Sequence, residues 1–98
     1  MRYSIAAAVL DAFPGYARGV VVARGCRNSL ANADLAALLR DVEAAVRTDS
    51  ALDNVALHPG IAAWRAAFGR FGATPSKFPS SVEAIVKRAR RGDALHYV

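Results

Sequence analysis

Apolar residues recur every three or four positions in two stretches of the chain, the spacing that places side chains on one face of a helix. The first stretch comprises Leu35, Leu38, Leu39, Val42 and Val46, and the second comprises Ile61, Trp64, Phe68 and Phe71. The first predicts an amphipathic helix of about three to four turns, with Glu43 and Arg47 paired four residues apart on its solvent side. The second predicts that Trp64 is a core residue rather than a surface for stacking.

Several residues mark where helices begin and end. Pro59 suits the first turn of a helix, where its missing N–H is not needed, and Gly72 suits the left-handed conformation that closes one. A short loop over residues 73–79 follows and carries Lys77. Ser80 and Glu83 then form an S-x-x-E capping box, which predicts that a further helix starts there.

Two other runs have the character of strands. Residues 18–23 contain three consecutive valines and predict a buried strand, and residues 3–6 predict an edge strand. Residues 7–13 predict a short helical or irregular turn, and residues 94–98 predict the beginning of another strand. The elements together predict an α/β (α+β) fold, a small mixed sheet of two to three strands packed with about three helices. Because the last strand stops as it begins, we expect residues 1–98 to be one truncated domain.

The charge is unevenly distributed along the chain. Residues 1–59 are balanced, so the net charge of +5 lies in residues 60–98. The basic residues there are Arg65, Arg70, Lys77, Lys87, Arg88, Arg90 and Arg91. Such a basic half suits a phosphate-binding surface, since neutralising phosphates releases counterions. The alternative is a solvated last helical turn, where cations are favoured by the helix dipole.

Composition excludes several classes of protein. The single cysteine, Cys26, excludes an internal disulfide and a cysteine-based metal cluster. No apolar stretch approaches the roughly 20 residues that span a bilayer, and the apolar run near the N-terminus is too short for a signal peptide, so we expect a cytoplasmic protein. Neither a Walker A loop nor a Ser-His-Asp or metal-ligand spacing occurs, and no metal or cofactor is expected.

The region from residue 58 to residue 88 contains the string F-G-x-x-P-S-K-x-x-S-S-V-E-A and resembles a known family. The matching residues are His58, Pro59, Ile61, Trp64, Arg65, Phe71, Gly72, Pro75, Ser76, Lys77, Ser80, Ser81, Glu83, Ala84 and Arg88, together with residues 19–25 upstream. They resemble the tRNA-editing (B-three/B-four) domain of the phenylalanyl-tRNA synthetase beta subunit, in its free-standing version. The family's domain is longer, so the chain resembles its N-terminal half only.

The resemblance implies hydrolysis of the ester that joins tyrosine to the terminal ribose of phenylalanine tRNA. Such a site orients a water, stabilises the developing oxyanion and discriminates the tyrosine hydroxyl, without needing a strong nucleophile. Phenylalanine tRNA is then the partner, and His58 and Glu83 are the catalytic candidates. The candidates for binding substrate or RNA are Arg65, Ser76, Lys77, Ser80, Ser81, Arg88, Arg90 and Arg91.

Other interpretations of these residues stay open. His58 also fits the N-terminal residue of a helix, and Ser80, Ser81 and Glu83 fit simple capping. The chain as a whole also fits a basic tRNA- or RNA-binding module without catalysis. A further alternative is an inactive structural remnant that folds only with a missing half or as a homo-oligomer.

Overall fold

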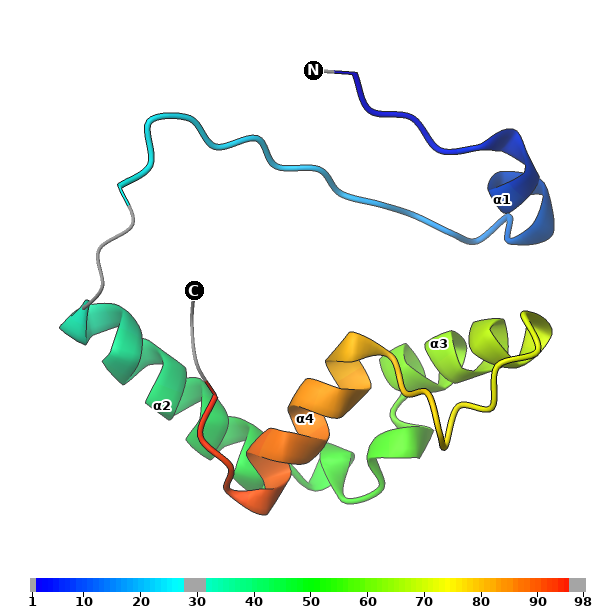
Figure 1. Cartoon of the computed structure of the whole chain (residues 1–98). Helices are drawn as coiled ribbons and strands as arrows, with labels where there is room; N and C mark the ends of the chain where they lie inside the picture. Colours follow the sequence, from blue (N-terminus) through cyan, green and yellow to red (C-terminus); the bar gives the residue numbers. More distant parts are fainter. Residues whose placement is uncertain (1, 28–31, 96–98) are drawn as a thin grey trace.

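The computed structural model describes residues 2–27 and 32–95, and Figure 1 shows the course of the chain. Its helices are α1 (Ala7–Ala12), α2 (Ala33–Thr48), the 3₁₀ turns η1 (Ser50–Leu52) and η2 (Val55–Leu57), α3 (Pro59–Arg70) and α4 (Ser81–Arg91). Within the two described ranges there is no strand, so the predicted α/β fold with a mixed sheet is wrong. No helix in these ranges is long and apolar enough to cross a membrane.

The two segments predicted as strands have no strand beside them. In residues 18–23, Val20, Val21 and Val22 are 53%, 93% and 56% exposed, and no backbone hydrogen bond joins this segment to residues 3–6. The contact between the two segments is a cation–π pair, with the Arg18 guanidinium 4.7 Å from the centre of the Tyr3 ring. β-Branched residues favour an extended backbone, but a strand exists only when a neighbour completes its hydrogen bonds. The predicted strand at 94–98 falls partly on residues 96–98, outside the described residues.

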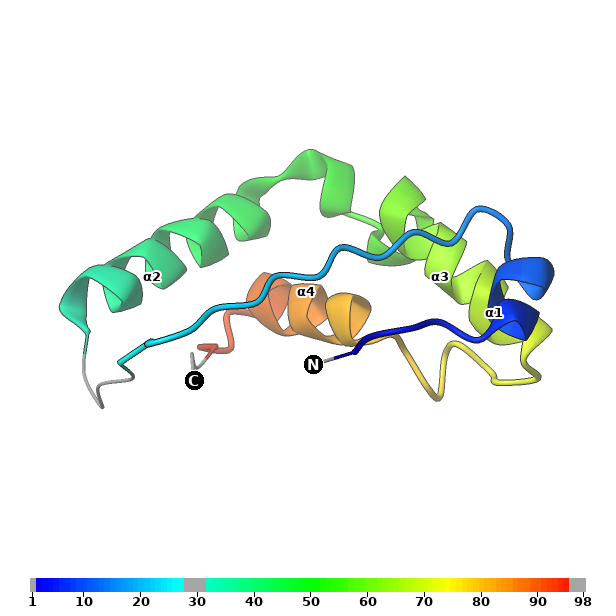
Figure 2. The same cartoon turned by 90° about the horizontal axis from the view of Figure 1, so that it is seen from above.

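The helices form an open arc rather than a closed globule (Figures 1 and 2). α2 packs on α4, and η2 contacts both α3 and α4. The N-terminal segment, residues 2–27, meets the rest of the molecule where α1 lies beside the end of α3. The radius of gyration is 16.6 Å, whereas a compact domain of this length has about 13 Å.

α2 confirms the predicted helix but not its orientation. The face of α2 that carries Glu43 lies against α4, and Glu43 is only 3% exposed. Leu35, Leu38 and Val42 are 48%, 58% and 51% exposed on the other side. The predicted solvent-side pair of Glu43 with Arg47 is therefore wrong, because Glu43 pairs instead with Arg40 at 2.9 Å and accepts the Leu95 N–H at 2.6 Å.

The buried core is small and partly polar. Its hydrophobic members are Leu52, Ile61 and Ala89, and its polar members are Glu43, Ser80 and Glu83. Burial of apolar surface stabilises a fold by roughly 25 cal/mol per Å². Because so few apolar side chains are buried here, hydrogen bonds and ion pairs contribute much of the stability of the fold. Those interactions concentrate around α4.

The predicted helix boundaries around α3 and α4 are confirmed. Pro59 is the first residue of α3, and Gly72 has a φ of 81°, which lets the Ala73 N–H reach the Phe68 carbonyl at 3.0 Å. This left-handed residue and its hydrogen bond form the closing turn that glycine favours. Ser80 caps α4 by accepting the Glu83 N–H at 3.4 Å. The loop between the helices thus has a fixed start and a fixed end.

Candidate functional site

Three charged side chains of the region 58–88 meet between α3 and α4, and two of them, Arg65 and Glu83, are matching residues of the resemblance. Arg65 of α3 donates from Nη1 to Glu83 Oε1 at 2.7 Å, and Lys87 donates from Nζ to the same oxygen at 2.6 Å. The Glu83 side chain is fully buried, while those of Arg65 and Lys87 are 26% and 43% exposed. We call these residues the Arg65–Glu83–Lys87 cluster. It links the two helices through one carboxylate oxygen.

The cluster keeps its carboxylate charged. Burial by itself raises the pKa of Glu83, because a charged carboxylate loses its hydration there. The hydrogen bond and charge of Lys87, followed by the charge and hydrogen bond of Arg65, outweigh that effect and hold the pKa below its ordinary value. Glu83 is therefore ionised at neutral pH, with an excess of positive charge around it.

The second carboxylate oxygen of Glu83 has no partner. Among the described residues, Oε2 is the buried side-chain oxygen or nitrogen that makes no hydrogen bond. Buried polar atoms are nearly always hydrogen-bonded, and an ionised carboxylate oxygen can only accept. The cluster therefore has acceptor capacity left over at one atom.

One of the two hydrogen bonds of the predicted capping box is formed, from the Glu83 N–H to the Ser80 hydroxyl. Ser80 is 8% exposed and caps α4, whereas Ser81 is the exposed first residue of the helix. In a full capping box the carboxylate would return to the Ser80 N–H, but Glu83 binds Arg65 and Lys87 instead. Glu83 thus belongs to the contact between helices as well as to the helix start. Its pairing with Lys87 at the i, i+4 spacing was readable from the sequence, whereas Arg65 lies 18 residues away and was not.

His58 lies at the start of α3 and is not joined to the cluster. Its Nδ1 accepts the Gly60 N–H at 3.3 Å, which makes His58 the N-terminal cap of α3. Within the described ranges no hydrogen bond or ion pair connects His58 with Glu83. The two catalytic candidates therefore have separate structural roles.

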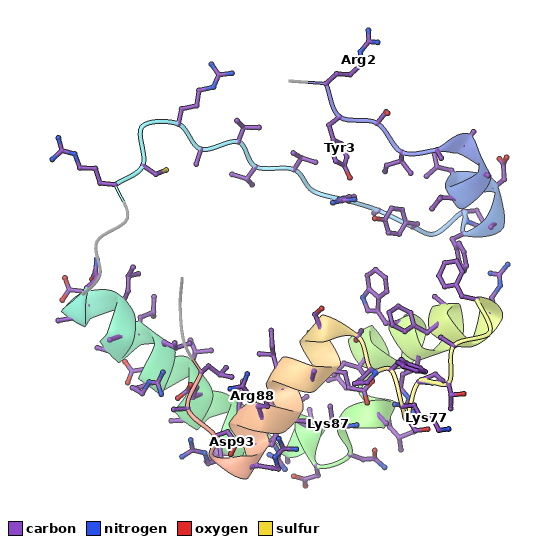
Figure 3. All side chains as sticks on the ribbon, in the orientation of Figure 1. Arg2, Tyr3, Lys77, Lys87, Arg88 and Asp93 are labelled. Atoms are coloured by element: carbon purple, nitrogen blue, oxygen red, sulfur yellow. The ribbon has the colours of Figure 1, made fainter. Side chains whose placement is uncertain are left out.

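Ser76 and Lys77 lie in the loop between α3 and α4. The turn is held by the Thr74 carbonyl, which accepts the N–H groups of Lys77 and Phe78, each at 2.9 Å. Both Ser76 and Lys77 are exposed. Figure 3 shows Lys77 in this loop, apart from Lys87 and Arg88 on α4.

The basic residues at the end of α4 are engaged in internal contacts. Arg90 donates to the carbonyls of Val46, Arg47 and Asp49 at 3.4, 2.8 and 3.1 Å. It also binds the Asp53 carboxylate at 2.7 Å, so it neutralises the end of α2 where carbonyls lack helical partners. Sequence reasoning missed this role, because nothing local to Arg90 indicates which helix end lies beside it.

The neighbours of Arg90 make weaker contacts at the surface. Arg91 pairs with Asp93 at 3.0 Å, and both side chains are at least half exposed. Arg88 donates to the Ala94 carbonyl at 3.4 Å. Exposed contacts of this kind contribute little stability and leave both arginines accessible.

Trp64 is not a core residue, contrary to the sequence-based prediction. It is 43% exposed and lies in an aromatic group with Tyr16 and Phe68, whose ring centres are 6.4 and 6.3 Å from its own. This group borders a pocket of about 690 Å³ between α1, the turn after it, and α3. The helical spacing of the aromatic residues was correct, but the layer expected to cover them is missing from the described residues.

In the part of the chain that the structure describes, no three His, Cys, Asp or Glu side chains are placed to hold a metal ion together. Cys26 is an exposed free cysteine in the segment that follows α1.

Comparisons with protein-family models, with curated proteins and with solved structures give no match for this chain. The likeness to the editing domain therefore rests on the residues that carry it.

Proposed function

We propose that this chain contributes an editing-type site that hydrolyses the ester of mischarged phenylalanine tRNA, as the resemblance implies. The observation that supports the proposal is the Arg65–Glu83–Lys87 cluster. Its Arg65 and Glu83 are matching residues of the resemblance, and they meet across two helices with one carboxylate oxygen, Oε2, left without a partner. A chain that needed these residues for capping alone would not require Arg65 to reach Glu83.

The lowered pKa defines what Glu83 can do chemically. An efficient general base has a pKa near the working pH. The pKa of Glu83 lies below its ordinary value, so Glu83 is a poor general base. Its Oε2 can accept a hydrogen bond, but this atom is buried, so Glu83 acts by holding Arg65 and Lys87 in place rather than by touching the substrate. We therefore assign Glu83 the role of positioning Arg65 and Lys87. In the proposed reaction, water adds to the carbonyl carbon of the activated ester, and the bond to the ribose oxygen breaks, so that the ribose leaves as its hydroxyl.

The test measures tyrosine release from phenylalanine tRNA charged with tyrosine, with the correctly charged tRNA in parallel. The proposal expects release above the spontaneous rate, and much slower release of phenylalanine. Lys77→Ala changes an exposed side chain of the string and is expected to lower the rate by about tenfold without unfolding the chain. Glu83→Gln is expected to lower it at least as much.

Glu43→Gln is the matched control, because Glu43 is also a buried, ion-paired carboxylate but lies outside the string. It is expected to leave the rate within about twofold when circular dichroism shows equal helix content. Equal losses in Glu83→Gln and Glu43→Gln, with Lys77→Ala unchanged, would mean that the rate follows folding alone. Binding of tRNA without any release would favour the non-catalytic module.

A further inference from the structure

The aromatic pocket lies on the side of α3 that faces α1, away from α4. It is lined by Val9, Phe13, Pro14, Gly15, Tyr16, Ala17, Ala63, Trp64, Ala67, Arg70 and Phe71. Its volume of about 690 Å³ is within the range of small-molecule sites, roughly 300–1,000 Å³. Arg65, the next residue after Trp64, points instead to Glu83, so α3 separates this pocket from the cluster.

Aromatic rings form much of the wall of the pocket. Phe13 and Phe71 pack with ring centres 4.9 Å apart, and Tyr16 meets Trp64 edge to face. Trp64 and Phe71 are nevertheless 43% and 66% exposed. Large aromatic rings left open beside a pocket provide surfaces on which another flat ring can stack.

The charge at the pocket is positive. The Arg70 guanidinium lies 4.5 Å from the centre of the Phe13 ring, and no aspartate or glutamate lines the pocket. Among the described residues, no carboxylate forms an ion pair with Arg70. An uncompensated arginine beside exposed aromatic rings matches a ligand that combines a flat ring with a negative charge.

We propose that this pocket binds one nucleotide of single-stranded RNA, with the base stacked on Trp64 or Phe71 and a phosphate bound by Arg70. The choice of RNA rests on the proposed function, but nucleotide binding is measured without any hydrolysis. Base stacking on aromatic side chains tolerates any base, and a guanidinium binds phosphate through two parallel hydrogen bonds.

Trp64 is the single tryptophan of the chain, so intrinsic fluorescence reports directly on the pocket. The experiment titrates the full chain with AMP, adenosine and ribose 5-phosphate. We expect saturable quenching by AMP at about 1 mM, weaker quenching by adenosine, and none by ribose 5-phosphate. Arg70→Gln is expected to weaken AMP binding by about tenfold while leaving the response to adenosine unchanged.

Two further variants make the result decisive. Phe71→Leu removes an exposed ring and is expected to weaken AMP and adenosine binding alike by about fivefold or more. Arg91→Gln is the charge control, since Arg91 pairs with Asp93 and does not line the pocket, and it is expected to bind AMP as the unmodified chain does. Absence of quenching by AMP at about 10 mM, or equal effects of Arg70→Gln and Arg91→Gln, would overturn the proposal.

The outcome for the pocket is separate from that for hydrolysis. Nucleotide binding that depends on Arg70, in a chain that releases no tyrosine, leaves the pocket in place and removes the proposed function. Tyrosine release by a chain that does not bind AMP would support the proposed function and contradict the nucleotide pocket. Quenching by adenosine and AMP to the same extent would show an apolar ring site without a phosphate contact, which also contradicts the proposal.

Discussion

Replacing Glu83 with glutamine tests whether the Arg65–Glu83–Lys87 cluster holds α3 against α4. The amide has nearly the size of the carboxylate, so the packing volume is kept while the negative charge is removed. In the variant, Arg65 and Lys87 face each other near a neutral group, although both donate to the same oxygen in the native chain. We expect the change to destabilise the fold more than any other change of one charged residue to its neutral counterpart.

The expected size follows from the burial of the three side chains. Breaking a fully buried ion pair costs about 3–5 kcal/mol, because a charge is left without a partner. Here the charges left behind belong to side chains that are 26% and 43% exposed, so water solvates them in part. The loss is therefore about 2–3 kcal/mol. For a small domain with a stability of roughly 5 kcal/mol, that is about half of the total.

Urea unfolding followed by helical circular dichroism measures the loss. With a slope of roughly 1.5 kcal/mol per M, the midpoint is expected to fall by about 1–2 M. A cycle that combines Glu83→Gln with Arg65→Met is expected to give a coupling free energy of about 1–2 kcal/mol. A midpoint within about 0.3 M of the native one would refute the view that this cluster holds the helices together.

The pH dependence gives an independent check of the same reasoning. The pKa of Glu83 is lower in the folded state than in the unfolded chain, where a glutamate titrates near about 4.3. Its stabilisation is therefore complete above the unfolded pKa and disappears as the pH falls through the folded pKa. The difference in stability between the native chain and Glu83→Gln is expected to shrink below about pH 4, measured by urea unfolding at each pH.

Three further changes test other parts of the structure. Gly72→Ala is expected to lower the free energy of unfolding in urea by about 1 kcal/mol, because Gly72 has a φ of 81°. Gly69→Ala is expected to raise it by about 0.5 kcal/mol, because Gly69 lies inside α3 with open space around it. A change of the same sign in both variants would contradict the assigned end of α3. Arg90→Gln is expected to lower the free energy of unfolding by about 1–2 kcal/mol, because the contacts of Arg90 with the end of α2 are lost. Arg91→Gln is expected to lower it by less than about 0.5 kcal/mol. Equal losses in the two variants would count against the role of Arg90 at the end of α2. The exposed apolar face of α2 is expected to make the chain self-associate at micromolar concentration in sedimentation, and Leu38→Lys is expected to reduce this; a monomeric native chain would be the contrary result.

Helix positions were predictable because their signals are local. Pro59, Gly72 and Ser80 act through their own backbone or the next few residues, and each lies where the sequence placed it. The faces of the helices were less predictable, because an apolar stripe requires another layer to cover it. Leu38 has the helical spacing of a core residue but is 58% exposed.

The strand prediction failed for a related reason. Three consecutive valines favour an extended backbone, whereas a sheet depends on a second segment that is distant along the chain. Val21 is 93% exposed because no described segment pairs with it. The candidate site was likewise predictable only in its local part. The pair of Glu83 and Lys87 follows from their i, i+4 spacing on one helix, whereas the contact of Glu83 with Arg65 depends on how α3 and α4 are placed.

The placement of the cations changes where a phosphate contact should be sought. The sequence concentrates the net positive charge after residue 60, and α4 holds the densest group. In the fold, however, Arg65 and Lys87 neutralise a buried carboxylate, and Arg90 binds three carbonyls and a carboxylate. A cation that already has close partners gains less from a phosphate, because it must give up those contacts or share them. Arg70 and Lys77, like Arg88, form no ion pair within the described residues, so these three cations are better placed for a phosphate contact than Arg65, Lys87 and Arg90.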